Sequence, residues 1–343
     1  MTAASAAYLN HAVERTGKKR QLFPRRSPPA FGLWQPNTPV KGKQAAMGNL
    51  LQGVHPREGT SMVTEYGKEG YVMTSDGVRL HYVEAGAGKP VVLLPGWSQT
   101  VTEFKEQFAG LHDRYRLIAL NMRGHGDSDT PAFGYRIARL SKDLYEVLGA
   151  LNLHEVALLG HSMGCAVIWS YWELFGAERL AQLILVDCAP CLTANPAWSA
   201  AEREAAGAVL TVEALYELCN ALASPHGVET TKQLFSGTVT RTMSEADQAW
   251  LLTEHLRFPR QHAATLLAHL ATQDWRDVIP RITLPTLIVG GRVSLVPWQS
   301  QVWIHEHIAG SRLEIFEEHE GGNHHMFIEG ATKFNRLLAE FLG

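Results

Sequence analysis

The residues Gly160-His-Ser-Met-Gly164 place a serine between two glycines in a GxSxG pattern. A largely apolar run, residues 155–159, precedes the pattern, and the apolar-rich segment 165–172 follows it, as expected for a strand, a turn and a helix. A tight turn in this context favours glycine at its flanking positions and holds the serine hydroxyl above the sheet. The pattern therefore predicts a nucleophilic Ser162, although glycine and serine are also common in ordinary loops.

The elements that position this serine follow a regular alternation from Tyr71 onward. Strands are expected at 79–84, 91–94, 117–120, 156–159, 183–186, 286–289 and 313–316, and helices at 103–111, 137–151, 166–174 and 332–342. Parallel strands need crossover connections, which are usually helices. Apolar runs bounded by Gly and Pro also fit strands that are buried on both faces. The alternation predicts an α/β fold with a doubly wound, mostly parallel sheet.

One long segment interrupts the alternation. Between Asp187 and Trp275 the sequence shows helical patterns without a clear strand, which predicts an inserted helical cap over 189–275 and an α/β core over 62–188 and 276–343. Most large apolar residues of the cap are expected to pack it onto the core, and some are expected to face an apolar substrate. These residues are Trp198, Leu210, Leu215, Tyr216, Leu222, Phe235, Trp250, Leu251, Leu252, Leu256 and Phe258.

The first 61 residues differ from the rest in composition. Up to Arg57 they contain nine Lys or Arg and one acidic residue, Glu14, together with several prolines. Such a segment cannot bury enough apolar surface to offset its ordering entropy, so we expect 1–61 to be mostly disordered. It also fits an organelle transit peptide, a solvated tail, or an over-extended start with Met47 or Met62 as the true first residue.

Charge and composition narrow the class of partner. A net charge of −3 over 343 residues gives no field for nucleic acid or anionic membranes, so we expect a small-molecule partner. There is no apolar run of about 18 residues and no signal peptide, which favours a cytoplasmic protein, with organelle targeting as the alternative. Cys188-Ala-Pro-Cys191 has CxxC spacing, but no second Cys/His pair completes a zinc site. We expect no metal and no cofactor, and the sequence does not indicate an oligomeric state.

Several motifs together resemble those of the α/β-hydrolase superfamily, over about four-fifths of the chain. They are Leu94-Pro-Gly-Trp-Ser98, Asn121-Met-Arg-Gly-His-Gly-Asp-Ser128, Gly160-His-Ser-Met-Gly164, Gly322-Asn-His324 and Phe334-Asn335. The chain is most similar to the cap-bearing branch of small-molecule esterases, cofactor-free haloperoxidase-like enzymes and C–C bond hydrolases. The motifs are specific for the fold and a poor guide to the substrate.

The resemblance implies an oxyanion hole built from two backbone N–H groups, those of Trp97 and Met163. Pro95 replaces a histidine that is frequent in the family, and this change leaves both donors in place. Trp97 is otherwise an aromatic wall of the pocket. The motif that contains His125 resembles the family's loop after the fourth strand, where His125 is expected to be structural.

The resemblance also implies a histidine base near the end of the chain. An acidic residue often lies five positions after this histidine, which matches Glu329 to His324. His325 is the alternative if the loop register differs by one residue. His319 is expected to be a solvated loop residue.

The acid of a catalytic triad is missing from its usual place in the family. That place falls near Ser294, in Gly290-Gly-Arg-Val-Ser-Leu-Val-Pro-Trp298, and a hydroxyl cannot stabilise an imidazolium as a carboxylate does. Asp187 follows the strand expected at 183–186, a position from which some members of the superfamily supply the acid. Asp187 is therefore expected to be the acid, unless it only caps the following segment and another group, or none, serves the histidine.

Together these residues imply a mechanism. Ser162 attacks a carbonyl after His324 removes its proton, and water later releases the acyl enzyme. We expect a serine hydrolase of small apolar carboxylic esters or lactones. The alternatives are C–C bond hydrolysis, acyl transfer or perhydrolysis by the same triad, and a non-catalytic ligand receptor. Aspartyl-ester chemistry is disfavoured, because it needs a carboxylate in place of Ser162.

Overall fold

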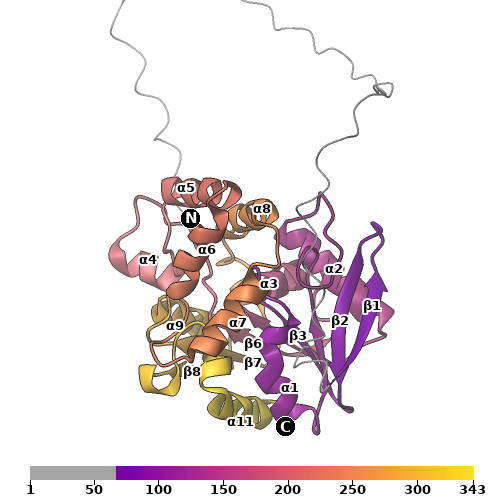
Figure 1. Ribbon diagram of the computed structural model, residues 1–343. Helices are drawn as coiled ribbons and strands as arrows, with labels where there is room; N and C mark the ends of the chain where they lie inside the picture. Colours follow the sequence, from indigo (N-terminus) through magenta and orange to yellow (C-terminus); the bar gives the residue numbers. More distant parts are fainter. Residues whose placement is uncertain (1–66) are drawn as a thin grey trace, which may run out of the picture. The chain divides into compact units, whose positions relative to one another are not determined.

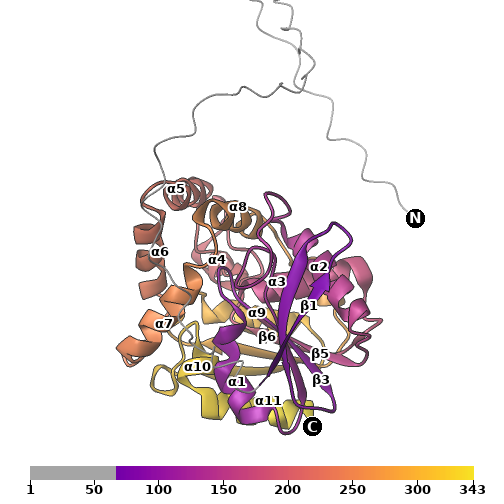
Figure 2. The same cartoon turned by 45° about the vertical axis from the view of Figure 1, so that its right-hand side comes forward.

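The computed structural model describes residues 67–343 (Figures 1 and 2). The basic segment 1–61 lies outside the described residues. The described residues form one eight-stranded sheet in the order β1-β2-β4-β3-β5-β6-β7-β8. Its strands are β1 (Lys68–Met73), β2 (Arg79–Ala85), β3 (Pro90–Leu94), β4 (Arg116–Leu120), β5 (Val156–His161), β6 (Leu180–Val186), β7 (Thr286–Gly291) and β8 (Arg312–Phe316).

The sheet is mostly parallel, as predicted from the sequence. All neighbouring strands from β4 to β8 pair in parallel, and only β1 and β2 are antiparallel to their neighbours. Strand β1 was not predicted, because Val72 is its only fully buried residue and the strand carries no apolar pattern. The sheet edge formed by β1 and β2 lies far from β5, β6 and β7, which carry the candidate site residues.

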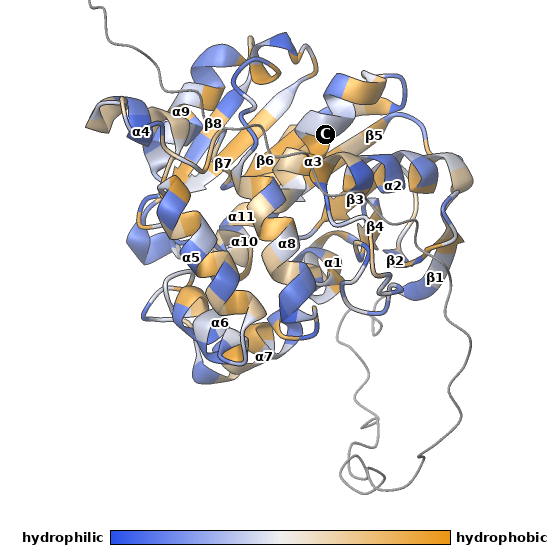
Figure 3. Ribbon diagram, turned by 90° about the horizontal axis from the view of Figure 1, so that it is seen from above, coloured by the Kyte–Doolittle hydropathy of each residue, from blue (hydrophilic) through white to orange (hydrophobic). Residues whose placement is uncertain are grey.

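Helices cover both faces of the sheet, which explains why its central strands are apolar throughout. The helices are α1 (Lys105–Leu111), α2 (Ile137–Ala150), α3 (Met163–Phe175), α9 (Trp298–His307) and α11 (Ala331–Leu342), of which α9 was not predicted. On β3, Val91 and Leu93 pack with residues of α1 and α11, whereas Val92 and Leu94 pack with residues of α2 and α3. Figure 3 shows the resulting concentration of apolar residues on the inner strands.

Five helices lie between β6 and β7, in the segment for which the sequence predicts a cap. They are α4 (Ala200–Ala206), α5 (Val212–Ala223), α6 (Gly227–Ser236), α7 (Glu245–His255) and α8 (Arg260–Ala271). Helix α5 packs on α8 through Leu215, Leu222 and Leu267. Figure 3 shows polar and apolar residues on different sides of α5 and α6, as expected for helices that bury one face. No helix within residues 67–343 is both long and apolar enough to cross a membrane.

A buried ion pair fixes the loop that follows β4. Arg123 is fully buried, and its guanidinium donates two hydrogen bonds to Asp143 of α2, at 2.6 and 2.7 Å. A third bond, at 3.0 Å, reaches Asp76 in the β1–β2 turn. A planar guanidinium that binds a carboxylate with two nitrogens defines its partner's orientation as well as its position. Arg123 therefore connects this loop to α2 and to the edge of the sheet.

We predict that Asp143→Ala lowers the free energy of unfolding by about 3–5 kcal/mol, because it leaves a buried cation with too few acceptors. Urea denaturation measures this change. The control is Glu340→Ala, which breaks an exposed pair with Arg312 at 3.4 Å and should cost less than about 1 kcal/mol. Equal effects of the two substitutions would contradict the prediction.

Candidate active site

Ser162 lies between the end of β5 and the start of α3. Its backbone adopts φ 51° and ψ −115°, a conformation that residues other than glycine rarely occupy. A Cβ atom at Gly160 would lie 2.5 Å from the backbone of Gly164, and one at Gly164 would lie 2.4 Å from the carbonyl oxygen of Leu94. Both glycines of the GxSxG pattern are thus required by close backbone contacts, and the turn they permit presents the serine at the edge of the sheet.

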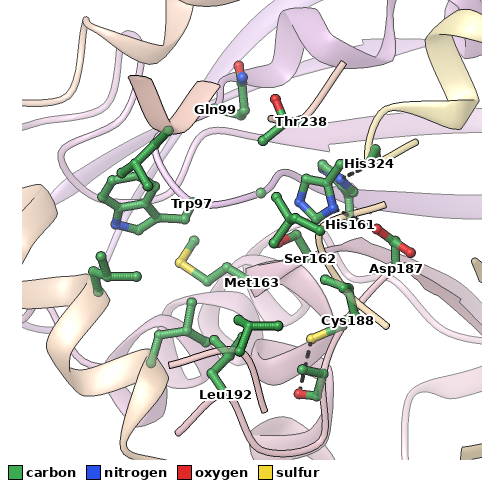
Figure 4. A pocket seen from close by; sticks show the side chains of 18 of the residues that line it. Trp97, Gln99, His161, Ser162, Met163, Asp187, Cys188, Leu192, Thr238 and His324 are labelled. Atoms are coloured by element: carbon green, nitrogen blue, oxygen red, sulfur yellow. Dashed lines mark hydrogen bonds and ion pairs between the residues drawn. The ribbon is translucent and has the colours of Figure 1, made fainter. Parts of the chain in front are cut away.

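His324 and Asp187 meet beside this turn, although 137 positions separate them in the sequence. Asp187 directly follows β6 and is fully buried, and His324 lies in the loop after β8. His324 Nδ1 is 2.7 Å from Asp187 Oδ2. Since the carboxylate accepts, Nδ1 carries the proton and Nε2 of the neutral ring is free to accept one. Figure 4 shows Ser162 between Met163 and these two side chains.

Ser294, on the turn after β7, contacts the Asp187 carboxylate directly. Its hydroxyl donates to Asp187 Oδ2 at 2.5 Å, and the backbone N–H of Gly291 donates to Asp187 Oδ1 at 3.2 Å. The Asp187 backbone adopts φ 53°, and its N–H binds the Val289 carbonyl. The strand end that usually carries the acid therefore supplies two donors to a carboxylate carried by the neighbouring strand.

The other two candidate histidines do not contact Asp187. His325 is buried, with its ring centroid 5.2 Å from that of His161, and it directly precedes α10 (Met326–Glu329). His319 is exposed on a short 3₁₀ helix, Glu318–Glu320. Glu329, which suggested the register of His324, accepts from the backbone N–H and the hydroxyl of Thr240, between α6 and α7. Its carboxylate thus connects the histidine loop to the inserted helices.

Two backbone N–H groups are free at the positions expected for an oxyanion hole. The N–H groups of Trp97 and Met163 have no acceptor within residues 67–343, and both residues line the same cavity as Ser162. Met163 is the first residue of α3, where N–H groups lack an intrahelical partner. The Trp97 indole N–H donates to the carbonyl of Ala263 in α8 at 2.9 Å, so its side chain is also a wall of the cavity.

His125 holds the loop that carries Trp97. Its Nδ1–H donates to the Arg123 carbonyl at 3.0 Å, which leaves Nε2 to accept the backbone N–H of Ser98 at 3.2 Å. The ring stacks on Phe258, with 4.0 Å between centroids. Burial lowers the pKa of His125 to about 4, which keeps the ring neutral in this role. His125 does not line the cavity.

The cavity above Ser162 is small and mostly apolar. Its volume is about 220 Å³, below the usual range of ligand sites, about 300–1,000 Å³. Its apolar wall comes from the inserted segment and from the loop after β7, and it contains Leu192, Val209, Leu210, Leu218, Leu234, Phe235, Leu267, Leu270, Leu295 and Val296. Of the large apolar residues singled out in the predicted cap, Leu210 and Phe235 face this cavity, whereas Leu215, Leu222, Leu251 and Phe258 are buried in packing contacts and Tyr216 is exposed.

Several residues at the site were not predicted from the sequence. Glu103 and His161 form a buried pair beside His324, and Cys188 contributes to the cavity wall. Glu103 falls in a helical pattern, where a carboxylate ordinarily faces solvent, so no sequence signal identifies it. The position of His161 next to the nucleophile was the one available indication. Cys188 and Cys191 are free thiols.

A sequence profile described as the alpha/beta hydrolase fold matches residues 89–331. The AB hydrolase superfamily protein YisY of Bacillus subtilis is 28% identical over 274 residues, which are 79% of this chain and 98% of that protein. The esterase EaEST of Exiguobacterium antarcticum has a similar structure, with TM-score 0.72, 30% identity, and coverage of 79% of this chain and 98% of that one.

A bromoperoxidase from Bacillus anthracis shares the fold, with TM-score 0.73, 23% identity, and coverage of 80% and 99% of the two chains. These matches confirm the expected fold class and the expectation of an α/β-hydrolase enzyme. The profile match spans most of the sheet, from β3 to the loop beyond β8, and includes Ser162, Asp187 and His324. The chain belongs to the alpha/beta hydrolase fold family.

Proposed function

We propose that this protein is a serine hydrolase that cleaves small apolar carboxylic esters or lactones through an acyl-enzyme. The observation that carries the proposal is the buried hydrogen bond between His324 and Asp187 beside the Ser162 turn. A neutral imidazole held by a carboxylate is the arrangement that activates a serine hydroxyl. The similarity to an esterase at 30% identity supports the same class of reaction.

In the proposed mechanism each group has one task. His324 Nε2 takes the Ser162 proton as Oγ attacks the substrate carbonyl, and the carbonyl oxygen becomes an oxyanion. The N–H groups of Trp97 and Met163 bind this oxyanion. His324 then gives its proton to the leaving alkoxide, and it later activates the water that releases the acid. Ser162 and His324 are not hydrogen-bonded in this structure, and such contacts commonly tighten when substrate binds.

The cavity supports the substrate class. An enclosure of about 220 Å³ with aliphatic walls suits a short or compact acyl group and offers no charged partner for a substrate carboxylate. Because an apolar site holds water poorly, it also suits transfer of the acyl group to an alcohol or to peroxide. Product analysis with and without these acceptors separates transfer and perhydrolysis from hydrolysis.

We predict that a fluorophosphonate probe labels Ser162 in the native protein and that Ser162→Ala abolishes labelling. Asp187→Asn should slow labelling by about 10⁴-fold, because the asparagine leaves the wrong tautomer of His324 and cannot stabilise its charged form. The rates are measured by mass spectrometry of the intact protein, with circular dichroism to check folding.

The control for this prediction is Ser294→Ala, which removes one donor to Asp187 and keeps the carboxylate. Loss of one such hydrogen bond is worth about 1.5–3 kcal/mol at most, so labelling should slow by far less than in Asp187→Asn. Absence of labelling in the native protein would contradict the proposed function. Equal decreases in the labelling rate of Asp187→Asn and Ser294→Ala would contradict the role of Asp187.

The pH dependence follows from the environment of His324. Burial lowers the pKa of His324 below its ordinary 6.5, while the hydrogen bond and charge of Asp187 act in the opposite direction. The base must be neutral, so we expect acylation to slow only as pH falls through a midpoint below 6.5. Removal of the carboxylate should lower this pKa further. A histidine NMR titration of Asp187→Asn tests the shift, and a higher midpoint than in the native protein would contradict it.

Leu267 of α8 tests the assignment of the cavity as the acyl site. We predict that Leu267→Trp, which fills part of the cavity, lowers kcat/KM for bulky acyl esters by about 10–200-fold and leaves acetate esters nearly unaffected. The matched control is Val212→Trp, an exposed position of α5 outside the cavity. An equal decrease in kcat/KM for all acyl groups would argue against acyl binding at this wall.

A further inference from the structure

A chain of buried hydrogen bonds runs behind the candidate active site. The Glu103 carboxyl group, on the 3₁₀ helix Val101–Phe104, is fully buried and accepts the backbone N–H of Gly96 at 3.0 Å. Both of its oxygens lie 3.3 Å from Nδ1 of His161. On the other side of the ring, His161 Nε2 is 3.1 Å from the carbonyl oxygen of His324. This chain joins the residue before the oxyanion donor Trp97 to the candidate base.

We propose that Glu103 and His161 act as a positioning pair that sets the distance between the oxyanion loop and the histidine base, with the shared proton on the Glu103 carboxyl. Neither residue lies on the reaction path, so both act through Gly96 and His324. The inference rests on the proposed function and adds two residues to it.

The hydrogen-bond directions restrict the protonation state. The His324 carbonyl can only accept, so His161 Nε2 carries a proton. His161 Nδ1 then either carries a second proton and faces a carboxylate, or presents a lone pair to a protonated carboxyl. In the second case the carboxyl O–H donates to Nδ1, and the group still accepts from Gly96.

Electrostatics favours the neutral form of the pair. Burial raises the pKa of Glu103 well above its usual range and lowers the pKa of His161 to about 4. Charge separation in such a site costs desolvation on both partners. The rings of His161 and His324 are 4.6 Å apart, so a cation on His161 would oppose proton uptake by His324. The ionisable groups facing Glu103 are His161 at the end of β5 and His324 and His325 in the loop after β8.

Packing shows that the oxyanion loop rests directly on His161. A Cβ atom at Gly96 would lie 2.9 Å from His161 Nδ1 and 3.5 Å from Ser162 Cβ. The loop therefore approaches the ring as closely as a glycine allows. A misplacement of about 1 Å between reacting groups can lower the rate by about 10²-fold. A shift of the loop at Gly96 relative to His161 would therefore slow the reaction.

Glu103, His161 and His325 fit a shared proton better than they fit a metal ion. Ligand atoms of Glu103, His161 and His325 lie within 4.8 Å of one another. However, the two ring nitrogens of His161 already face Glu103 and the His324 carbonyl, and Glu103 also binds Gly96. A cation would have to replace the shared proton and weaken these contacts. The existing hydrogen bonds favour a proton at this position.

The test compares Glu103→Gln with Glu103→Leu. A glutamine reproduces the neutral carboxyl group, because its NH₂ can donate to His161 Nδ1 while its oxygen accepts from Gly96. Glu103→Gln should keep near-native kcat for 4-nitrophenyl acetate and a native pH profile. Glu103→Leu leaves both neighbours without a partner, and it should lower kcat by about 10²-fold with little change in KM.

His161→Leu should lower kcat by about as much as Glu103→Leu does. Since the pair acts as a unit, kcat of the double variant should be no lower than that of either single variant. The matched control is Leu144→Ala. Leu144 of α2 is fully buried, and it packs in the core on the other face of the sheet, outside the cavity. This variant should be destabilised comparably and retain native kcat.

Infrared difference spectroscopy gives a readout that does not depend on activity. A protonated Glu103 has a carboxylic C=O stretching band in the native protein, and Glu103→Gln should remove it. Absence of this band would overturn the proton assignment. A decrease in kcat in Glu103→Gln as large as in Glu103→Leu would overturn it too. A stoichiometric metal in the native protein that is lost in Glu103→Gln would overturn it as well.

Fluorophosphonate labelling separates this inference from the proposed function. No labelling of the native protein would mean that the proposed function has failed. Native labelling together with an unchanged labelling rate in folded Glu103→Leu and His161→Leu would mean that the function stands and the positioning pair does not.

Discussion

The architecture of this site depends on a single buried hydrogen bond, from His324 to Asp187. A fully buried carboxylate is tolerated only when enough donors surround it, and three donors, from Gly291, Ser294 and His324, converge on Asp187. Asp187 and its donors lie at the carboxyl ends of β6, β7 and β8, which run parallel. Because parallel strands place their carboxyl ends at one edge, residues that are distant in the sequence meet there. The parallel arrangement of β6, β7 and β8 therefore allows His324 to reach Asp187.

The sequence was informative where local geometry restricts the residue type. Gly160 and Gly164 are required by close backbone contacts, so the Ser162 turn could be read directly from them. Asp187 could be proposed because it ends an apolar run, although its contact with His324 depends on tertiary structure. Glu103 could not be found, since only the fold shows that its place in a helical pattern is buried. Strand β1 and helix α9 were missed for a related reason: neither carries a strong apolar period.

The inserted segment is connected to the same loops that carry the candidate site. Trp97 binds the Ala263 carbonyl in α8, and Glu329 binds Thr240 between α6 and α7. A displacement of these helices would therefore move the loops that carry Trp97 and His324, as well as the apolar wall of the cavity. The cavity wall and the loops on either side of Ser162 are physically coupled through these contacts, because the inserted segment contributes to both.

The buried environment of the site disfavours a second charged group beside Asp187. A carboxylate at position 294 would bring a second negative charge close to Asp187, and the two like charges would repel each other. A hydroxyl there turns the same contact into a stabilising one. On the opposite side of His324, the pair of Glu103 and His161 avoids an additional charge by sharing one proton. In the proposed mechanism, the imidazolium of His324 then has one anionic partner, Asp187. A hydroxyl at position 294 is thus compatible with a buried carboxylate that follows β6, whereas a carboxylate there is not.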